Sequence, residues 1–150
     1  MVYEPNALLG RLVGCRLYSA QFVLDYVQLW FDSEASRDEP LLTCDVLPDV
    51  ALEGRWFTPA EPGWSDALPT LVERRVTATH EATGIGLGLD FASGAIRLHP
   101  AENDLVGPEI AMLSGFADRR WMVWRPGEEA FEDLQPRAAA GPSFAAVRPV

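Results

Sequence analysis

The chain has 150 residues and a formal net charge of −10, because 22 acidic residues face only 12 basic ones, all of them arginine. Hydrophobic residues make up 48% and charged residues 23%, which is the composition of a folded globular protein and excludes a disordered chain. The negative charge argues against binding to nucleic acid or to an anionic membrane. Solubility alone is the favoured explanation of this charge, and a basic protein partner is the alternative.

Targeting, membrane and metal signals are not found. The segment "MVYEPNALLG" has no basic n-region and no apolar h-region, and no stretch approaches the roughly 20 apolar residues of a membrane span. Cys15 and Cys44 form no C-x-x-C pair, so neither a zinc motif nor a disulfide framework is indicated. We therefore expect a cytoplasmic protein without a metal or a cofactor.

The first half of the chain predicts a short helical turn followed by strands. Asn6 is placed to cap the turn, and Leu8 and Leu12 lie on its inner side. Strands are expected at 14–22, at 27–31, at 42–46 and from Pro48 onward. The Pro- and Gly-rich stretch 53–64 is expected to be the connection between the two halves.

The second half predicts the same order of elements. Ser65 is placed to cap a short helix, and strands are expected at 73–81, 87–91, 95–99 and from Pro108 onward. A hairpin with arms 111–116 and 120–124 and a last short helix in 128–134 follow. The remaining stretch, 135–150, is rich in Pro and Ala and is expected to be a mobile tail.

The two halves echo one another at a fixed distance. "NAL" at 6–8, "VQLWFDS" at 27–33 and "PDVAL" at 48–52 match "DAL", "LGLDFAS" and "PEIAM" sixty residues later, and "LVGCRL" at 12–17 matches "LVERRV" at an offset of 59. Two unrelated β-rich halves also show similar alternation, but here the matches keep their order. We predict pseudo-repeats at about 6–57 and 65–125.

The expected fold is a β-dominated α+β fold. Two pseudo-repeated antiparallel β units of about 60 residues each would form a bent sheet or a barrel-like single globular domain with short helices over residues 1–134.

The glycines of "TGIGLGLDFASG" do not support a nucleotide site. Their spacing fits neither G-x-G-x-x-G nor a P-loop. Gly86 and Gly88 share one face of a strand, and the matching face of the first half carries Tyr26, Gln28 and Trp30. Either these rings cover the glycines, which is favoured because aromatic rings commonly cover strand glycines, or they are partly exposed for recognition.

No catalytic constellation is visible in the sequence. His80 and His99 lie in no metal-binding spacing, and a Ser-His-Asp set would have to be assembled by tertiary structure alone. The acids are dispersed and form no EF-hand loop. The sequence therefore favours a non-enzymatic protein, with no catalytic and no metal-binding residue predicted.

The segment "RRWMVWRPGEEAFEDL" places two tryptophans in one strand. Trp121 and Trp124 point to opposite faces, so one ring is exposed unless another segment covers it. Glu128 and Glu129 fall in the first helical turn, where they complement the dipole.

The pattern L-x-G-x-x-V, a strand ending D-Y-V-Q-L-x-F, and a terminal hairpin followed by W-R-P-G-E resembles a family of small actinomycete proteins of unknown function. The resemblance covers most of residues 8–134. It implies no activity, and no functional residue is carried over from it.

Three functions are weighed. The first is a non-enzymatic binding or regulatory protein, of the immunity or antitoxin kind, that recognises a basic protein partner. Its expected anchors are Tyr26, Gln28, Trp30, Trp121 and Trp124, and its acidic field comes from Glu128, Glu129, Glu132 and Asp133. The second is a small-molecule-binding barrel with a cleft between the pseudo-repeats, and the third is a hydrolase-like enzyme that uses His80 or His99. A homodimer is left open.

Overall fold

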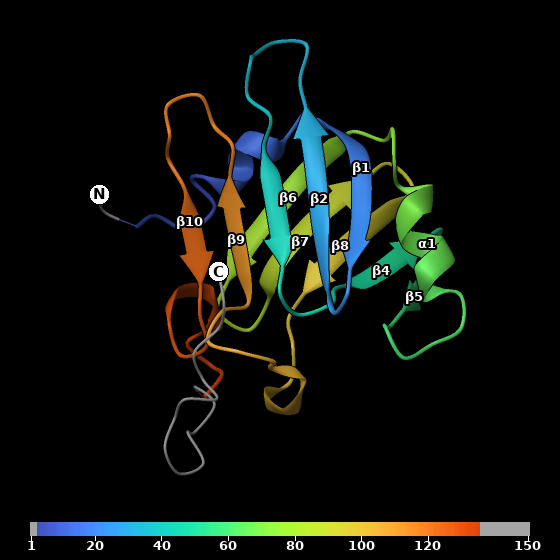
Figure 1. Cartoon of the computed structure of the whole chain (residues 1–150), viewed down its shortest axis with the longest axis vertical. Coiled ribbons are helices and arrows are strands. Elements are labelled where there is room, and N and C mark those ends of the chain that lie inside the picture. Colours follow the sequence, from blue (N-terminus) through green and yellow to red (C-terminus); the bar gives the residue numbers. More distant parts are fainter. Residues whose placement is uncertain (1–2, 136–150) are drawn as a thin grey trace.

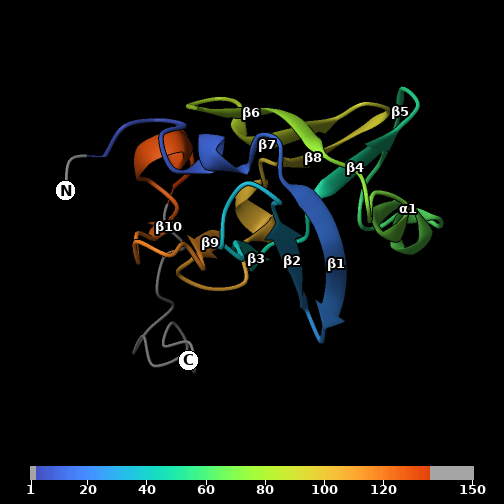
Figure 2. The same ribbon diagram turned by 90° about the horizontal axis from the view of Figure 1, so that it is seen from above.

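Ten strands form two antiparallel five-stranded sheets in the computed structural model, which describes residues 3–135 (Figures 1 and 2). The first sheet has the order β1-β2-β3-β9-β10 and the second β5-β4-β8-β7-β6. Every strand pairing is antiparallel, so the predicted β-dominated antiparallel fold is confirmed. Both orders end in edge strands, so the two sheets do not close into a barrel. In chain order the elements are η1 (Leu9–Leu12), β1 (Arg16–Val23), β2 (Tyr26–Asp32), β3 (Leu41–Cys44), β4 (Asp49–Leu52), β5 (Arg55–Phe57), α1 (Trp64–Thr70), β6 (Val76–Ala82), β7 (Gly86–Phe91), β8 (Gly94–Leu98), η2 (Glu102–Asp104), β9 (Ala111–Ser114), β10 (Met122–Trp124) and η3 (Glu129–Phe131).

Each sheet is built from both units. The first three strands of a unit stay together, and its last two strands, a hairpin, join the sheet of the other unit: β9 and β10 extend β3, and β4 and β5 extend β8. The helix that opens each unit also packs against the other unit, since η1 of the first unit contacts β6 and α1 of the second contacts β1. The two predicted units are therefore intertwined and not separate.

A pseudo-twofold relation is visible where β1 and β6 begin. Arg16 forms an isolated antiparallel bridge with Arg75, which is its own sequence echo. A residue that pairs with its counterpart lies at a twofold axis. Both strands also carry a bulge one position after an apolar residue, at Tyr18 in β1 and at Thr77 in β6. These shared irregularities agree with a repeated unit.

The segments "PDVAL" and "PEIAM" match in sequence but do not occupy equivalent positions in the two sheets. Leu42 of β3 pairs with Leu113, whereas its counterpart in β8, Ile96, pairs with Val50. The structural counterpart of Val50 is therefore Leu113 and not Ile110, which the sixty-residue offset would give. The shift arises because the connecting segments of the two units differ in length. Residues 33–40 lead into β3, whereas only 92–93 lead into β8. After these strands, 45–48 follow β3 and 99–110 follow β8.

One hydrophobic core lies between the sheets. Val27, Leu29 and Phe31 of β2 are buried in it together with Leu87 and Leu89 of β7, as their alternation predicts. The opposite faces of β2 and β7 consequently point away from each other, one on each side of the two layers seen in Figure 2.

The favoured explanation for the aromatic face is therefore wrong. Tyr26 and Trp30 are separated from the strand glycines by the whole core, so they cannot cover them. Gly88 is covered instead by His80 of the neighbouring strand, since a Cβ added at Gly88 would lie 3.3 Å from Cδ2 of that ring. Tyr26, Gln28 and Trp30 are partly exposed on the outer face of the first sheet.

Neither predicted helix cap is formed. The side chain of Asn6 is engaged elsewhere, because its Oδ1 accepts a hydrogen bond of 2.7 Å from the Thr79 hydroxyl. The helix α1 begins one residue before Ser65, after Gly63, whose φ of 99° only glycine adopts at low cost. Long-range bonding and backbone conformation thus outweigh the local capping preferences.

The stretch 53–64 contains a strand that the composition did not predict. β5 pairs with β4 across a two-residue turn in which Glu53 and Gly54 both have positive φ, 51° and 84°. Such a turn matches the twist of a hairpin. The predicted tail lies, apart from Gln135, outside the described residues.

Replacing Leu24 by glycine is expected to stabilise the fold by about 1 kcal/mol. Leu24 occupies the turn between β1 and β2 with a φ of 53°, and its side chain is 100% exposed. Glycine removes the backbone strain, and no buried contact is lost. Chemical denaturation checks the gain, with Leu24→Ala as the control: alanine also removes the exposed side chain but keeps Cβ, so a similar gain from alanine would contradict the strain argument.

Candidate functional site

The two tryptophans of the terminal hairpin lie in different environments. Trp121, just before β10, is 59% exposed, whereas Trp124 is 1% exposed and belongs to the core. This is the division that the alternation predicts. Trp124 is consequently not available as a surface anchor, and Trp121 is.

Trp124 is fixed by a buried carboxylate on β6. Its indole N–H donates to Glu81 at 2.8 Å, and the hydroxyl of Tyr3 donates to the same oxygen at 2.5 Å. The other oxygen of Glu81 accepts from the backbone N–H of Asn6 at 2.7 Å. Glu81 thus joins the N-terminal segment to β6 and β10, and burial together with this hydrogen bond raises the pKa of Tyr3.

Sequence reasoning missed Glu81 because of the bulge in β6. Strict alternation from buried Val76 would turn position 81 outward, but the register shift after Val76 turns Thr79 and Glu81 inward. A bulge of this kind leaves no clear sequence signal. The bulge at the equivalent position of β1 is likewise seen only in the structure.

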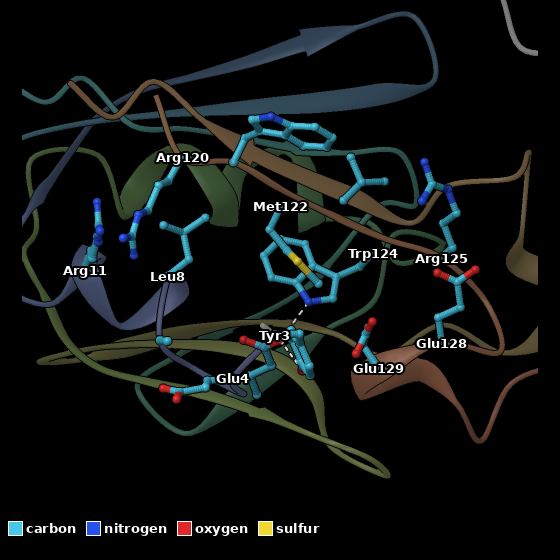
Figure 3. A pocket seen from close by; sticks show the side chains of 14 residues that line it. Tyr3, Glu4, Leu8, Arg11, Arg120, Met122, Trp124, Arg125, Glu128 and Glu129 are labelled. Atoms are coloured by element: carbon cyan, nitrogen blue, oxygen red, sulfur yellow. Dashed lines mark hydrogen bonds between the residues drawn. The ribbon is translucent and has the colours of Figure 1, made fainter. Parts of the chain in front are cut away.

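Beside Glu81 lies a pocket with a volume of about 470 Å³, hereafter the β10 pocket (Figure 3). One wall comes from the N-terminal segment and η1, another from β10, and a third from the start of η3. It is therefore a junction between the two units. The lining residues are Tyr3, Glu4, Ala7, Leu8, Arg11, Glu81, Arg120, Trp121, Met122, Val123, Trp124, Arg125, Glu128 and Glu129.

The arginines of the β10 pocket are paired with two acids that lie outside its lining. Asp118 pairs with Arg11 at 3.0 Å and with Arg120 at 3.6 Å, and Glu109 pairs with Arg125 at 3.7 Å. Arg11 is also held over the ring of Phe116, 5.2 Å from its centroid. These contacts reduce the positive charge that the lining offers to a ligand.

The acids of the pocket remain without such neutralisation. Glu4, Glu128 and Glu129 form no ion pair within residues 3–135, and Glu81 is bonded only to uncharged donors there. Leu8 and Met122 add apolar surface to the same lining (Figure 3), and so does the exposed ring of Trp121. The pocket is therefore apolar at its walls and negative in balance.

The remaining predicted anchors lie apart from this pocket. Gln28 pairs with Thr43, Thr43 pairs with Met112, and Met112 pairs with Val123, so these residues form one row across the first sheet. The side chains of such a row lie on the same outer face, which β2 and β10 therefore share. Along this face, the buried indole N–H of Trp30 has no hydrogen-bond partner among the described residues.

Each histidine contacts a carboxylate at the surface. His80 Nε2 lies 2.8 Å from Asp90, in a hollow of about 290 Å³ on the outer face of the second sheet. His99 Nε2 lies 3.0 Å from Asp133. A carboxylate partner is one of the groups that a catalytic histidine uses. Neither cysteine can supply a nucleophile, because Cys15 and Cys44 are buried and burial raises the pKa of both thiols, that of Cys44 to about 12.

Replacing His99 by alanine is expected to raise the pKa of Asp133. The hydrogen bond from this ring holds the pKa of the Asp133 carboxyl below its ordinary value. A lowered folded pKa stabilises the fold above the ordinary aspartate value, about 3.9, and that contribution is lost as pH falls through the lowered value. NMR titration checks the change. The pKa of Asp118, lowered mainly by the Arg120 backbone N–H, serves as the control and should stay low.

A second pocket, of about 580 Å³, lies where both units cross between the sheets, and we call it the crossover pocket. Its lining includes Asp45 and Leu47 from the first crossing and Pro100 and Asp104 from the second. Burial, followed by the charge of Asp104, raises the pKa of Asp49 in this lining. Within residues 3–135, no three potential metal-ligand side chains lie close enough to hold an ion.

No family model, curated protein or solved structure matches this chain. The candidate site therefore rests on its own geometry. None of the helices in the described part of the chain has the length and apolar character needed to cross a bilayer.

Proposed function

We propose that this chain is a non-enzymatic binding protein that recognises a basic protein partner through the β10 pocket. The observation that carries the proposal is the convergence of Trp121 with Glu128 and Glu129 on one concave surface. Aromatic side chains in concave sites are the residues that most often dominate binding energy, and a negative rim favours encounter with a positive partner.

The charge of the whole chain supports the same direction of recognition. The described part carries all 22 acids but only 10 of the 12 arginines, so its excess of negative charge is larger than the −10 of the full sequence. A protein with this field attracts basic partners over several ångströms and repels acidic ones.

Replacing Trp121 by alanine is expected to weaken partner binding by about 30-fold or more, as for an interface hot spot. The partner is captured from the native host with the wild-type chain, and its affinity is measured by titration calorimetry. Trp56 is the matched control, because its ring is 45% exposed and lies on the other sheet, so Trp56→Ala should leave the affinity within about threefold. Equal losses in both variants, or a captured partner that is acidic, would contradict the proposal.

The acidic rim can be tested separately. Glu128→Gln with Glu129→Gln should slow association and reduce its salt dependence, because rim charges act mainly on the association rate. The double variant Glu39→Gln with Glu53→Gln changes the total charge equally at exposed positions outside the pocket lining. The two double variants should therefore differ in association rate.

A second candidate function is the binding of a small molecule in the crossover pocket. Its volume, about 580 Å³, is within the range of ligand sites, and it is lined by residues from both units, which is where the sequence predicts a cleft. A thermal-shift screen of cationic and neutral metabolites tests this function. A hit whose effect is lost in Asp49→Asn but kept in Trp121→Ala would favour it over recognition at the β10 pocket.

A further inference from the structure

Building on the proposed function, we propose that the partner binds as an extended segment that adds a sixth strand to the first sheet, along the edge of β10 that no strand of residues 3–135 pairs with. The segment carries Lys or Arg side chains next to apolar ones. The inference names both the binding mode and the kind of sequence that the β10 pocket accepts.

The position of β10 makes strand addition available. β10 ends the order β1-β2-β3-β9-β10 and has β9 as its strand neighbour on one side. The other side of an edge strand presents backbone N–H and C=O groups that pair readily with another extended chain.

The lining shows that the pocket lies against this edge and not over one face of the sheet. It includes every residue from Arg120 to Arg125. Side chains alternate between faces along a strand, so a pocket over one face would be lined by every second residue only. A lining of consecutive residues indicates that the backbone edge itself borders the space.

The opposite wall selects the side chains of the incoming strand. Ala7 and Leu8 offer apolar surface, and Glu4 adds a carboxylate near them. A segment in which apolar and basic residues alternate can place apolar side chains against this wall and its charges at the acidic rim.

Glu81 gives a specific position for one basic group. Its carboxylate accepts three hydrogen bonds, from Tyr3, Asn6 and Trp124, whereas a carboxylate offers about four acceptor positions. One position therefore remains for a donor from the pocket, and a Lys or Arg head would supply the first opposite charge to this buried group.

The flanks of β10 do not block such a strand. Arg120 and Arg125 stand at its two ends, where charges commonly protect an edge from pairing. Both are paired with acids, Asp118 and Glu109, so their repulsion of a basic segment is reduced.

The test uses defined peptides and the full chain. The probe is an acetylated, amidated peptide of alternating Val and Lys, seven residues long, in three forms: unmodified, N-methylated at the odd positions, and N-methylated at the even positions. In a strand, the amides of odd and even positions point to opposite edges, so only one methylated form blocks pairing with β10. We expect one form to bind at least about 30-fold more weakly than the unmodified peptide, and the other to bind within about threefold.

The outcomes separate this inference from the proposed function. Equal binding of the two methylated forms, or equal loss in both, overturns strand addition. Failure of the unmodified peptide to bind overturns it as well, while Trp121-dependent capture of a basic protein would still support the proposed function. As a second readout, exchange of the Val123 amide should slow at least about tenfold with the Lys peptide and stay unchanged with a peptide that has Glu in place of Lys.

Discussion

Replacing Glu81 by alanine is expected to destabilise the fold by roughly 3 to 5 kcal/mol, among the largest effects of any single change in this chain. The carboxylate is 8% exposed and accepts hydrogen bonds from Tyr3, Asn6 and Trp124. Its removal leaves the buried indole N–H of Trp124 without an acceptor and releases the N-terminal segment from β6. Urea denaturation followed by tryptophan fluorescence measures the loss.

Two further variants show which hydrogen bonds account for this loss of stability. Trp124→Phe keeps an aromatic ring in the core but removes one donor, so it should cost less than the loss of the carboxylate. Glu81→Gln keeps one acceptor oxygen and places an NH2 group against donors. Its loss of stability should therefore lie between that of Trp124→Phe and that of Glu81→Ala. A double-mutant cycle of Glu81→Ala and Trp124→Phe should give a coupling above about 1 kcal/mol, because the two residues share a bond. A loss below 1 kcal/mol for Glu81→Ala would show that water replaces the carboxylate without cost.

Periodicity predicted the strands and their buried faces because both depend on local pattern. Val27, Leu29 and Phe31 alternate with polar or aromatic neighbours, and that alternation is enough to decide which face is buried. The same holds for the terminal hairpin, where Trp121 and Trp124 separate as expected.

The exchange of hairpins between the units could not be predicted in this way. The β4–β5 hairpin has the same alternation whether it extends β3 of its own unit or β8 of the other. The choice depends on the length of the connection 45–48 and on the direction in which it leaves β3, and neither has a periodic signal. The sixty-residue echo thus did not predict how the two units are assembled.

The candidate site, too, could be predicted from local patterns only in part. Trp121, Glu128 and Glu129 were singled out from composition and helix position, but their convergence with the N-terminal segment depends on Glu81, which strict alternation placed outside. Tyr26 and Trp30 were grouped with them as partly exposed rings beside Gln28 on one strand face. They lie partly exposed on the outer face of the first sheet and do not belong to the lining of the β10 pocket.

Replacing Gly86 by alanine is expected to destabilise the fold by about 3 kcal/mol or more. Gly86 has a φ of 76°, and a Cβ at this position would lie 2.2 Å from the carbonyl oxygen of Leu98 on β8. The oxygen belongs to the backbone of β8, and the position of the Cβ is fixed by the backbone of β7, so neither can move without disturbing the pairing of β7 with β8. Thermal and urea denaturation measure the loss.

Gly88 is the matched control in the same strand. A Cβ there would meet only the ring of His80, at 3.3 Å, and that side chain is half exposed and able to turn away. Gly88→Ala should therefore cost less than about 1 kcal/mol and act mainly by weakening the contact between His80 and Asp90. If both glycines tolerate alanine, the strand is not held by the close approach of β8, and the Gly-rich stretch needs another explanation. If only Gly86 is intolerant, its glycine is required by backbone geometry, which agrees with the absence of a nucleotide-binding spacing around it.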